Sequence, residues 1–188
     1  MSGGRLPKSL TVNGREWYIR TNTWDIFKIL KAFGDPELEE NEKVYICFVI
    51  LYKNFDEMPE SDYEEAFKQA VWFLDYGLEP EDRKRPTLVD WEQDENLIYP
   101  AINSVAGREI RNDDYIHWWT FMGYYMEMKE SLFTTVLNIR KKKAQHKKLE
   151  KWETEFFNNN KKICILAPKL TAEEQAQKEA LRKLLGYK

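Results

Sequence analysis

The chain has 188 residues and a formal net charge of −3; 43% of its residues are hydrophobic and 14% are aromatic. This length fits one domain, alone or with an extension, and this apolar content excludes wholesale disorder. The longest apolar run, Val44 to Tyr52, is far shorter than the roughly 20 residues of a membrane-spanning helix, and the first ten residues lack the apolar core of a signal peptide. We therefore expect a soluble cytosolic protein with no membrane partner.

Residues 9–21 alternate apolar and polar side chains around Asn13-Gly14. Asn-Gly favours a two-residue hairpin turn, because both central residues of a type I′ turn need positive φ. The pattern predicts a small β-hairpin, which needs helices to pack against because a two-stranded hairpin is not stable alone. The side chains predicted to face those helices are Leu10, Val12, Trp17 and Ile19.

Apolar residues spaced three and four apart predict helices in the next part of the chain. The predicted helices and their signals are 24–33 (cap Thr23, end Gly34), 35–52 (start Asp35-Pro36) and 61–75 (capping box Ser61-x-x-Glu64, end Gly77). Each signal is a residue type that satisfies free backbone groups at a helix end or that cannot continue the helix.

The second half is also predicted to be mostly helical, after a linker or ordered loop over 78–89 that carries charges and two prolines. The predicted elements are a helix over 91–106 broken or kinked near Pro100, a turn over 107–112, a helix over 116–128 capped by Asp113 or Asp114, a helix over 131–160, a short strand over 162–167, and a helix over 171–185 with the capping box Thr171-x-x-Glu174 and the end Gly186. The fold class is thus mainly α: a compact helical bundle with an N-terminal hairpin over residues 1–160, and a C-terminal helical extension over residues 161–188.

Residues that support catalysis or metal binding are few in this sequence. His117 has Asp113 and Asp114 nearby but no nucleophile motif. The sequence contains no Cys/His cluster, calcium loop or glycine-rich phosphate loop. We therefore expect no enzymatic activity, no metal and no cofactor. Cys47 and Cys164 lie in apolar runs and are interpreted as buried free thiols.

Charge is distributed unevenly along the chain. Residues 35–82 contain fifteen acidic residues and three lysines (net −12), whereas residues 140–162 contain nine Lys or Arg and three Glu (net +6). This polarity favours oriented association. The basic run is also the best nucleic-acid candidate, since phosphate binding requires clustered cations; we favour a solvated helix face instead and do not expect a nucleic-acid partner. The basic residues are Arg140, Lys141, Lys142, Lys143, Lys147 and Lys148.

The segment 116–128, IHWWTFMGYYMEM, is dense in aromatic residues and methionines. On a helix its apolar side chains cover nearly the whole circumference, which is typical of a helix surrounded by its own protein or partly covered by another chain. Aromatic stripes mostly form cores, but Trp, Tyr and Met are also enriched at interfaces, so both interpretations stay open. The candidate partner-binding residues are Trp118, Trp119, Phe121, Met122, Tyr125 and Met126, with Trp152 and Phe156 further along.

The run Tyr115-Ile116-His117-Trp118-Trp119, followed by Phe121, resembles the H-W-W-x-F signature of the phage gene-product-fifteen family. Members are small proteins of tailed phages and prophages of low-GC Gram-positive bacteria. The surrounding order is similar as well, with WYI at 17–19, AVWFL at 70–74, LVDWEQD at 88–94 and IYPA at 98–101. The resemblance covers roughly residues 10–151.

This resemblance implies a non-enzymatic tail assembly chaperone that binds the tape measure protein during tail morphogenesis and keeps it soluble. It also implies a location in the host bacterial cytoplasm and absence from the mature virion. Self-association and contacts with other tail proteins are further expectations. Two alternatives stay open: a nucleic-acid-binding phage protein that uses Arg140–Lys151, and a structural head–tail or tail component.

Overall fold

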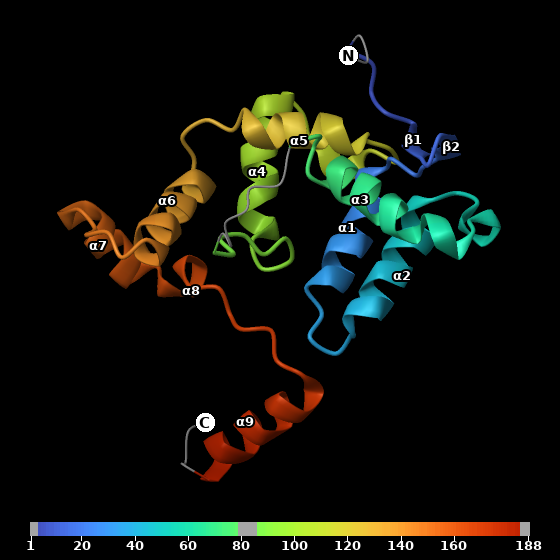
Figure 1. The fold of residues 1–188 in the computed structure, drawn as a ribbon. Coiled ribbons are helices and arrows are strands. Elements are labelled where there is room, and N and C mark those ends of the chain that lie inside the picture. Colours follow the sequence, from blue (N-terminus) through green and yellow to red (C-terminus); the bar gives the residue numbers. More distant parts are fainter. Residues whose placement is uncertain (1–3, 79–85, 185–188) are drawn as a thin grey trace.

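A computed structural model describes residues 4–78 and 86–184, which form a mainly α fold with one small β-hairpin (Figure 1). The predicted fold class is confirmed. The strands are β1 (Ser9–Val12) and β2 (Arg15–Tyr18). The α-helices of the described residues are α1 (Thr23–Phe33), α2 (Glu40–Leu51), α3 (Tyr63–Leu74), α4 (Glu95–Ala106), α5 (Trp118–Met126), α6 (Leu132–Ala144), α7 (Lys151–Asn159), α8 (Lys161–Cys164) and α9 (Ala172–Leu184), with the short 3-10 helices η1 (Phe55–Glu57), η2 (Glu60–Asp62) and η3 (Ile110–Asn112) between them.

The N-terminal hairpin forms as predicted. Strands β1 and β2 pair antiparallel, with Leu10 opposite Trp17. At the turn, Asn13 and Gly14 have φ angles of 47° and 82°, as an Asn-Gly hairpin requires. The four side chains predicted to face the helices are all buried, and β1 packs against α3. The hairpin is therefore stabilised by the helices that it covers.

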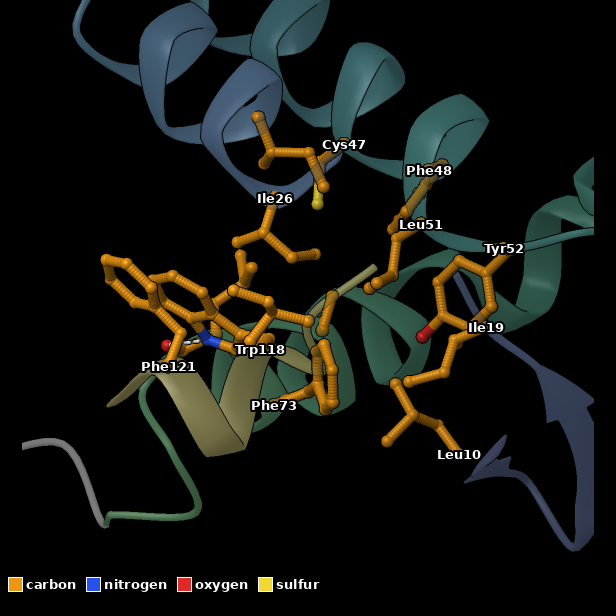
Figure 2. Close-up of a cluster of buried hydrophobic side chains, with 14 of the residues drawn as sticks. Leu10, Ile19, Ile26, Cys47, Phe48, Leu51, Tyr52, Phe73, Trp118 and Phe121 are labelled. Atoms are coloured by element: carbon orange, nitrogen blue, oxygen red, sulfur yellow. Dashed lines mark hydrogen bonds between the residues drawn. The ribbon is translucent and has the colours of Figure 1, made fainter. Parts of the chain in front are cut away.

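The apolar core lies between the hairpin and the helices α1 to α5. Figure 2 shows side chains from the hairpin and from α1, α2, α3 and α5 pointing into one cluster. Both thiols are free and buried, as expected, and burial raises the pKa of Cys47 to about 12. Each fully buried large apolar side chain contributes about 1.5–3 kcal/mol to folding, so this cluster is the main source of stability in this part of the molecule.

The start of α1 is tied to the segment that precedes α5. The predicted cap Thr23 is the first helical residue instead, and its hydroxyl donates to the carbonyl oxygen of Ile116 at 2.9 Å. The amide of Thr23 donates to the same oxygen at 2.8 Å, and the amide of Trp118 donates to the carbonyl oxygen of Thr21 at 2.7 Å. These contacts fix where α5 begins relative to α1.

Two other helix starts differ from the prediction. Helix α2 begins five residues after Asp35, because the side chain of Glu39 and the side chain of Glu42 form a capping box there. Ser61 lies within η2, and α3 begins at Tyr63 without a side-chain cap. The predicted Ser61 capping box is therefore wrong. Helix α4 is continuous across Pro100, so no break occurs there, and it ends at Gly107 in the left-handed conformation with φ 70°.

The predicted helix over 131–160 is two helices, α6 and α7. The chain leaves α6 after Ala144, and His146 has a φ of 54°. A capping box between Glu150 and Glu153 then starts α7. The predicted strand over 162–167 is also wrong, because α8 occupies its first residues.

The last helix starts at its predicted capping box. The hydroxyl of Thr171 accepts from the amide of Glu174, whose carboxylate accepts from the amide of Thr171. Helix α9 projects away from the rest of the molecule (Figure 1), and its side chains from 172 to 181 are all exposed. Gly186 and most of the predicted linker over 78–89 lie outside the described residues, and the predicted domain boundary at residue 160 stays a prediction.

Candidate partner-binding surface

His117 positions α5 as its N-cap residue. Its Nδ1 accepts a hydrogen bond from the amide of Trp119 at 3.0 Å, and its Nε2 donates to the carbonyl oxygen of Pro7 at 2.8 Å. The predicted cap by Asp113 or Asp114 is wrong, because α5 begins at Trp118 and its N-cap residue is His117. Burial lowers the pKa of His117 from its ordinary value of 6.5. The neutral imidazole therefore joins the N-terminal segment to α5, with both ring nitrogens engaged.

The inner face of α5 belongs to the core. Trp118 and Phe121 are 1% and 0% exposed, and their rings stack with centroids 5.7 Å apart. The indole N–H of Trp118 donates to the carbonyl oxygen of Leu74 at 2.9 Å (Figure 2). Tyr125 continues this face half-buried against Trp91, and burial raises the pKa of Tyr125 to about 12. Trp118 and Phe121 therefore present no surface to a partner in this structure, which corrects their place in the predicted contact set.

The outer face of α5 carries Trp119, Met122 and Met126, which we call the outer stripe. Met122 and Met126 follow Trp119 by three and seven residues, so the three side chains lie on one side of the helix. Trp119 and Met122 are half-buried, and Met126 is 52% exposed. The indole N–H of Trp119 donates to the carbonyl oxygen of Phe73 at 2.9 Å. The stripe thus combines one fixed aromatic ring with two flexible thioethers.

Aromatic side chains at the end of α3 extend the outer stripe. The rings of Trp72 and Tyr76 lie 5.3 and 5.2 Å from the ring of Trp119. Gly77 has a φ of 73°, and a Cβ there would lie 3.0 Å from Cη2 of Trp119. Glycine is therefore needed both because the turn has a positive φ and because a side chain would press against the indole of Trp119. The sequence prediction missed Trp72, which lies on α3, and Tyr76, which follows that helix with a φ of 61°.

Arg140 is not on the surface, contrary to its place in the predicted basic face. It is buried between α4, α6 and α8, where its guanidinium donates two hydrogen bonds to the carboxylate of Asp94, at 2.6 and 2.8 Å. It also donates to the carbonyl oxygens of Leu88, Ile163 and Cys164. All these contacts stabilise the fold, so Arg140 is removed from the candidate nucleic-acid site.

Two of the remaining cations are also used within the chain. The ammonium of Lys142 pairs with the buried carboxylate of Glu153 at 2.7 Å and holds the pKa of Glu153 below its usual range. The ammonium of Lys143 lies 4.1 Å from the ring centroid of Phe157. Lys141, Lys147 and Lys148 are exposed.

Helix α7 carries the two other predicted contact residues. The side chain of Trp152 is 58% exposed, whereas Phe156 is half-buried. The structure does not place them beside α5: α7 lies at the far end of the molecule, beyond α6 (Figure 1). They therefore form a second surface, separate from the outer stripe.

A groove of about 780 Å³ lies between α1, the start of α4 and the segment after α8. Gln93 holds that segment in place: its amide donates to the carbonyl oxygen of Ile165, and its side-chain oxygen accepts from the amide of Ala167. The sequence prediction missed this groove. Residues 165–169 come back to the start of α4 from more than 70 positions away in the sequence, and no local sequence pattern indicates such a contact. The apolar residues that line it include Phe27, Leu30, Phe33, Val89, Trp91, Tyr99 and Leu166.

The fold and this surface define a small mainly α protein whose candidate site is apolar and half-exposed. Within the described residues, no group of three or more His, Cys, Asp or Glu side chains could hold a metal ion, and none of the helices there is long and apolar enough to cross a bilayer. The family of bacteriophage Gp15 proteins matches residues 3–166, and the chain belongs to this family. The predicted resemblance is confirmed, and the match extends past it to include α7 and α8. No curated protein and no solved structure matches the chain.

Proposed function

We propose that this phage protein is a non-enzymatic tail assembly chaperone. It binds the tape measure protein in the cytoplasm of the host bacterium, keeps it soluble, and is absent from the mature virion. Membership of the bacteriophage Gp15 family supports the phage setting. The observation that carries the binding role is the outer stripe, an apolar helix face that the core covers only in part: Trp119 and Met122 are half-buried against the core and Met126 is 52% exposed.

The outer stripe suits reversible contact with an amphipathic helix. Methionine side chains are unbranched and polarisable, so they repack against varied apolar partners. Trp119 is held by its bond to Phe73, which reduces the entropy lost on binding. An apolar helix face that meets the apolar side of a partner helix is a common mode of recognition.

Co-expression with the tape measure protein tests this proposal. We expect the wild-type chain to keep the tape measure protein in the soluble fraction, and Met122→Glu/Met126→Glu to lose that effect because two charges enter the apolar contact. A matched control is Leu132→Glu, since Leu132 is 50% exposed on α6 and lies outside the stripe. A tape measure protein that is equally soluble with and without the chain would refute the proposal.

Two measurements address the alternatives. The exposed cations Lys141, Lys147 and Lys148 favour a nucleic-acid test, in which charge-driven binding should weaken steeply as salt rises. Absence of binding at low salt would exclude that alternative. Mass spectrometry of purified virions addresses the structural alternative, because an assembly chaperone is missing from the particles and a head–tail or tail component is present.

A further inference from the structure

The molecule has an acidic end and a basic end. The described residues 35–75, which include α2, η1, η2 and α3, carry twelve acidic residues and three lysines, a net charge of −9. Residues 140–162, from the end of α6 through α8, carry a net charge of +6. Figure 1 shows α2 and α3 on one side of the molecule and α7 and α8 on the other. The charge asymmetry of the sequence is therefore a separation of charge in space.

The acidic end exposes an apolar stripe on α2. Cys47, Phe48 and Leu51 bury the inner side of this helix, yet its outer side is apolar as well: Tyr45 and Val49 are 60% and 43% exposed. Such a helix is normally covered on both sides. Glu42 lies one turn before Tyr45, so a carboxylate borders the stripe.

Further carboxylates border that stripe on the η1 side. The ring of Phe55 lies 5.6 Å from the ring of Tyr45, and the exposed acids Asp56 and Glu57 follow it in η1. The carboxylate of Glu57 also pairs with Arg15 at 3.4 Å, in an exposed pair that water screens. A surface that fits this stripe combines apolar area with positive charge.

The basic end of the same chain has that composition. The side chain of Trp152 is 58% exposed on α7. Lys151, the first residue of α7, and Lys148, in the segment before that helix, precede Trp152 and are both exposed. Trp is the residue type most enriched among interface hot spots, where it fills an apolar site ringed by polar contacts.

We propose that a second copy of this chain covers the α2 stripe with its basic end, so that copies associate head to tail. Trp152 of one copy packs on Tyr45 and Val49 of the next, and the lysines around it face Glu42, Asp56 and Glu57. Opposite charges orient the approach of the two copies. Because the two surfaces differ, each added copy leaves one free acidic end and one free basic end, so the assembly can grow. This inference does not depend on binding of the tape measure protein.

Sedimentation velocity of the full chain over a range of concentrations tests the inference. We expect the wild-type protein to associate more as concentration rises, and to associate at least roughly tenfold more weakly when the salt concentration goes from about 0.05 to about 0.5 M, because screening shortens the range of the charges. Tyr45→Ala/Val49→Lys disables the acidic end, and Lys148→Glu/Trp152→Ala disables the basic end. Each variant alone should stay monomeric, with circular dichroism confirming its fold.

Mixing the two variants distinguishes a contact between unlike ends from a contact between like ends. The basic-end variant keeps an intact acidic end and the acidic-end variant keeps an intact basic end, so an equimolar mixture should form a heterodimer that does not grow further. Leu132→Ser, which changes an exposed apolar residue away from both ends, should associate like the wild type. This result also separates the inference from the proposed function, since no tape measure protein is present.

Three results would overturn the inference: a wild-type protein that is monomeric at every concentration, a single variant that still self-associates like the wild type, or a mixture that stays monomeric. A duplex DNA oligonucleotide at low salt serves as the competing ligand. If the basic-end variant loses DNA binding while it sediments like the wild type, the basic end contacts nucleic acid and the inference is wrong.

Discussion

The region from the hairpin to α5 and the region from α6 to α9 are held together by different interactions. In the first region, an apolar cluster joins the hairpin to α1 to α5, and Trp118 lies within it. In the second region, α6 also buries Phe133, Val136 and Ile139. Buried charged side chains add links there that the first region lacks in the described residues: Arg140 joins α6 to Asp94 and to the backbone around α8, and Glu153 joins α7 to Lys142 on α6. Apolar contacts are shared among many neighbours, whereas a buried ion pair depends on two side chains.

This difference predicts how a substitution in each region lowers the stability of the fold. Removal of one apolar side chain leaves a cavity whose neighbours can partly relax. Removal of one member of a buried ion pair leaves an uncompensated charge away from water. The predictions below test the comparison, from the largest expected effect to the smallest.

Trp118→Ala should lower the free energy of unfolding by about 3–5 kcal/mol, the range for loss of a fully buried aromatic side chain. It also leaves the carbonyl oxygen of Leu74 without its indole donor. Chemical denaturation followed by circular dichroism measures the change. The matched control is Trp152→Ala, which should change stability by less than about 0.5 kcal/mol because Trp152 is exposed. Equal effects of the two substitutions would mean that the inner face of α5 is not core.

Arg140→Ala should lower the free energy of unfolding by about 3 kcal/mol, because Asp94 then keeps its charge in a buried site. If the two regions are stabilised separately, hydrogen exchange should increase in α6 to α8 while α1 to α3 stay protected. Lys141→Ala, next to Arg140 but exposed, is the control. Uniform loss of protection over the whole chain would show that the regions unfold as one unit and would contradict the comparison.

Acid should destabilise the protein through His117. Burial lowers its pKa below the ordinary value of 6.5, so the unfolded chain binds a proton more readily than the folded chain. Stability is therefore complete above about pH 6.5 and decreases as the pH falls toward the folded-state pKa, by at most about 1.4 kcal/mol per pH unit for one proton. Unfolding free energies measured between pH 7 and pH 5.5 test this.

The chain has two histidines, which makes a clean control available. His117→Asn keeps a residue that caps helices well but does not titrate, so its stability should not depend on pH in this range. His146→Asn should keep the wild-type slope, because His146 is exposed and Asn tolerates its positive φ. A pH dependence that disappears with His146→Asn would contradict the role of His117.

Local patterns in the sequence predicted the fold class and most of the helices, because apolar spacing and turn residues act within a few positions. The segment 131–160 is helical in composition throughout, so its pattern does not show that the chain forms two helices there. The second of them starts at a Glu-x-x-Glu capping box at Glu150, and a box of the same type at Glu39 sets the start of α2. A pattern at the level of single helix turns therefore predicts that helices exist better than it predicts where they begin.

The candidate site was less predictable. Nearly every side chain of α5 is apolar, so sequence alone could not separate the buried pair Trp118 and Phe121 from the outer stripe. That division depends on neighbours from α3, more than 40 residues away. Arg140 did leave a signal, since it lies four and seven residues after the buried Val136 and Phe133, on the apolar side of α6. Its partner Asp94 is 46 residues away and has no local pattern.

The smallest effect should come from removal of α9. A chain that ends after Leu170 loses a helix whose side chains from 172 to 181 are exposed. It also loses the hydrogen bond from the amide of Ala172 to the carboxylate of Glu37 on the body. Its free energy of unfolding should stay within about 0.5 kcal/mol of the wild type, as for surface changes in general.

A chain that ends after Cys164 provides the comparison for that truncation. It also loses the segment bound by Gln93 and the pair between Lys169 and Asp90 at 3.2 Å, and with it one wall of the groove beside α1. We expect this shorter chain to be measurably less stable than the chain ending after Leu170. If the two truncations are equally stable, the polar contacts of residues 165–169 contribute nothing. If the longer one is already destabilised, α9 packs against the body in solution, and the second region is held by more than its buried side chains.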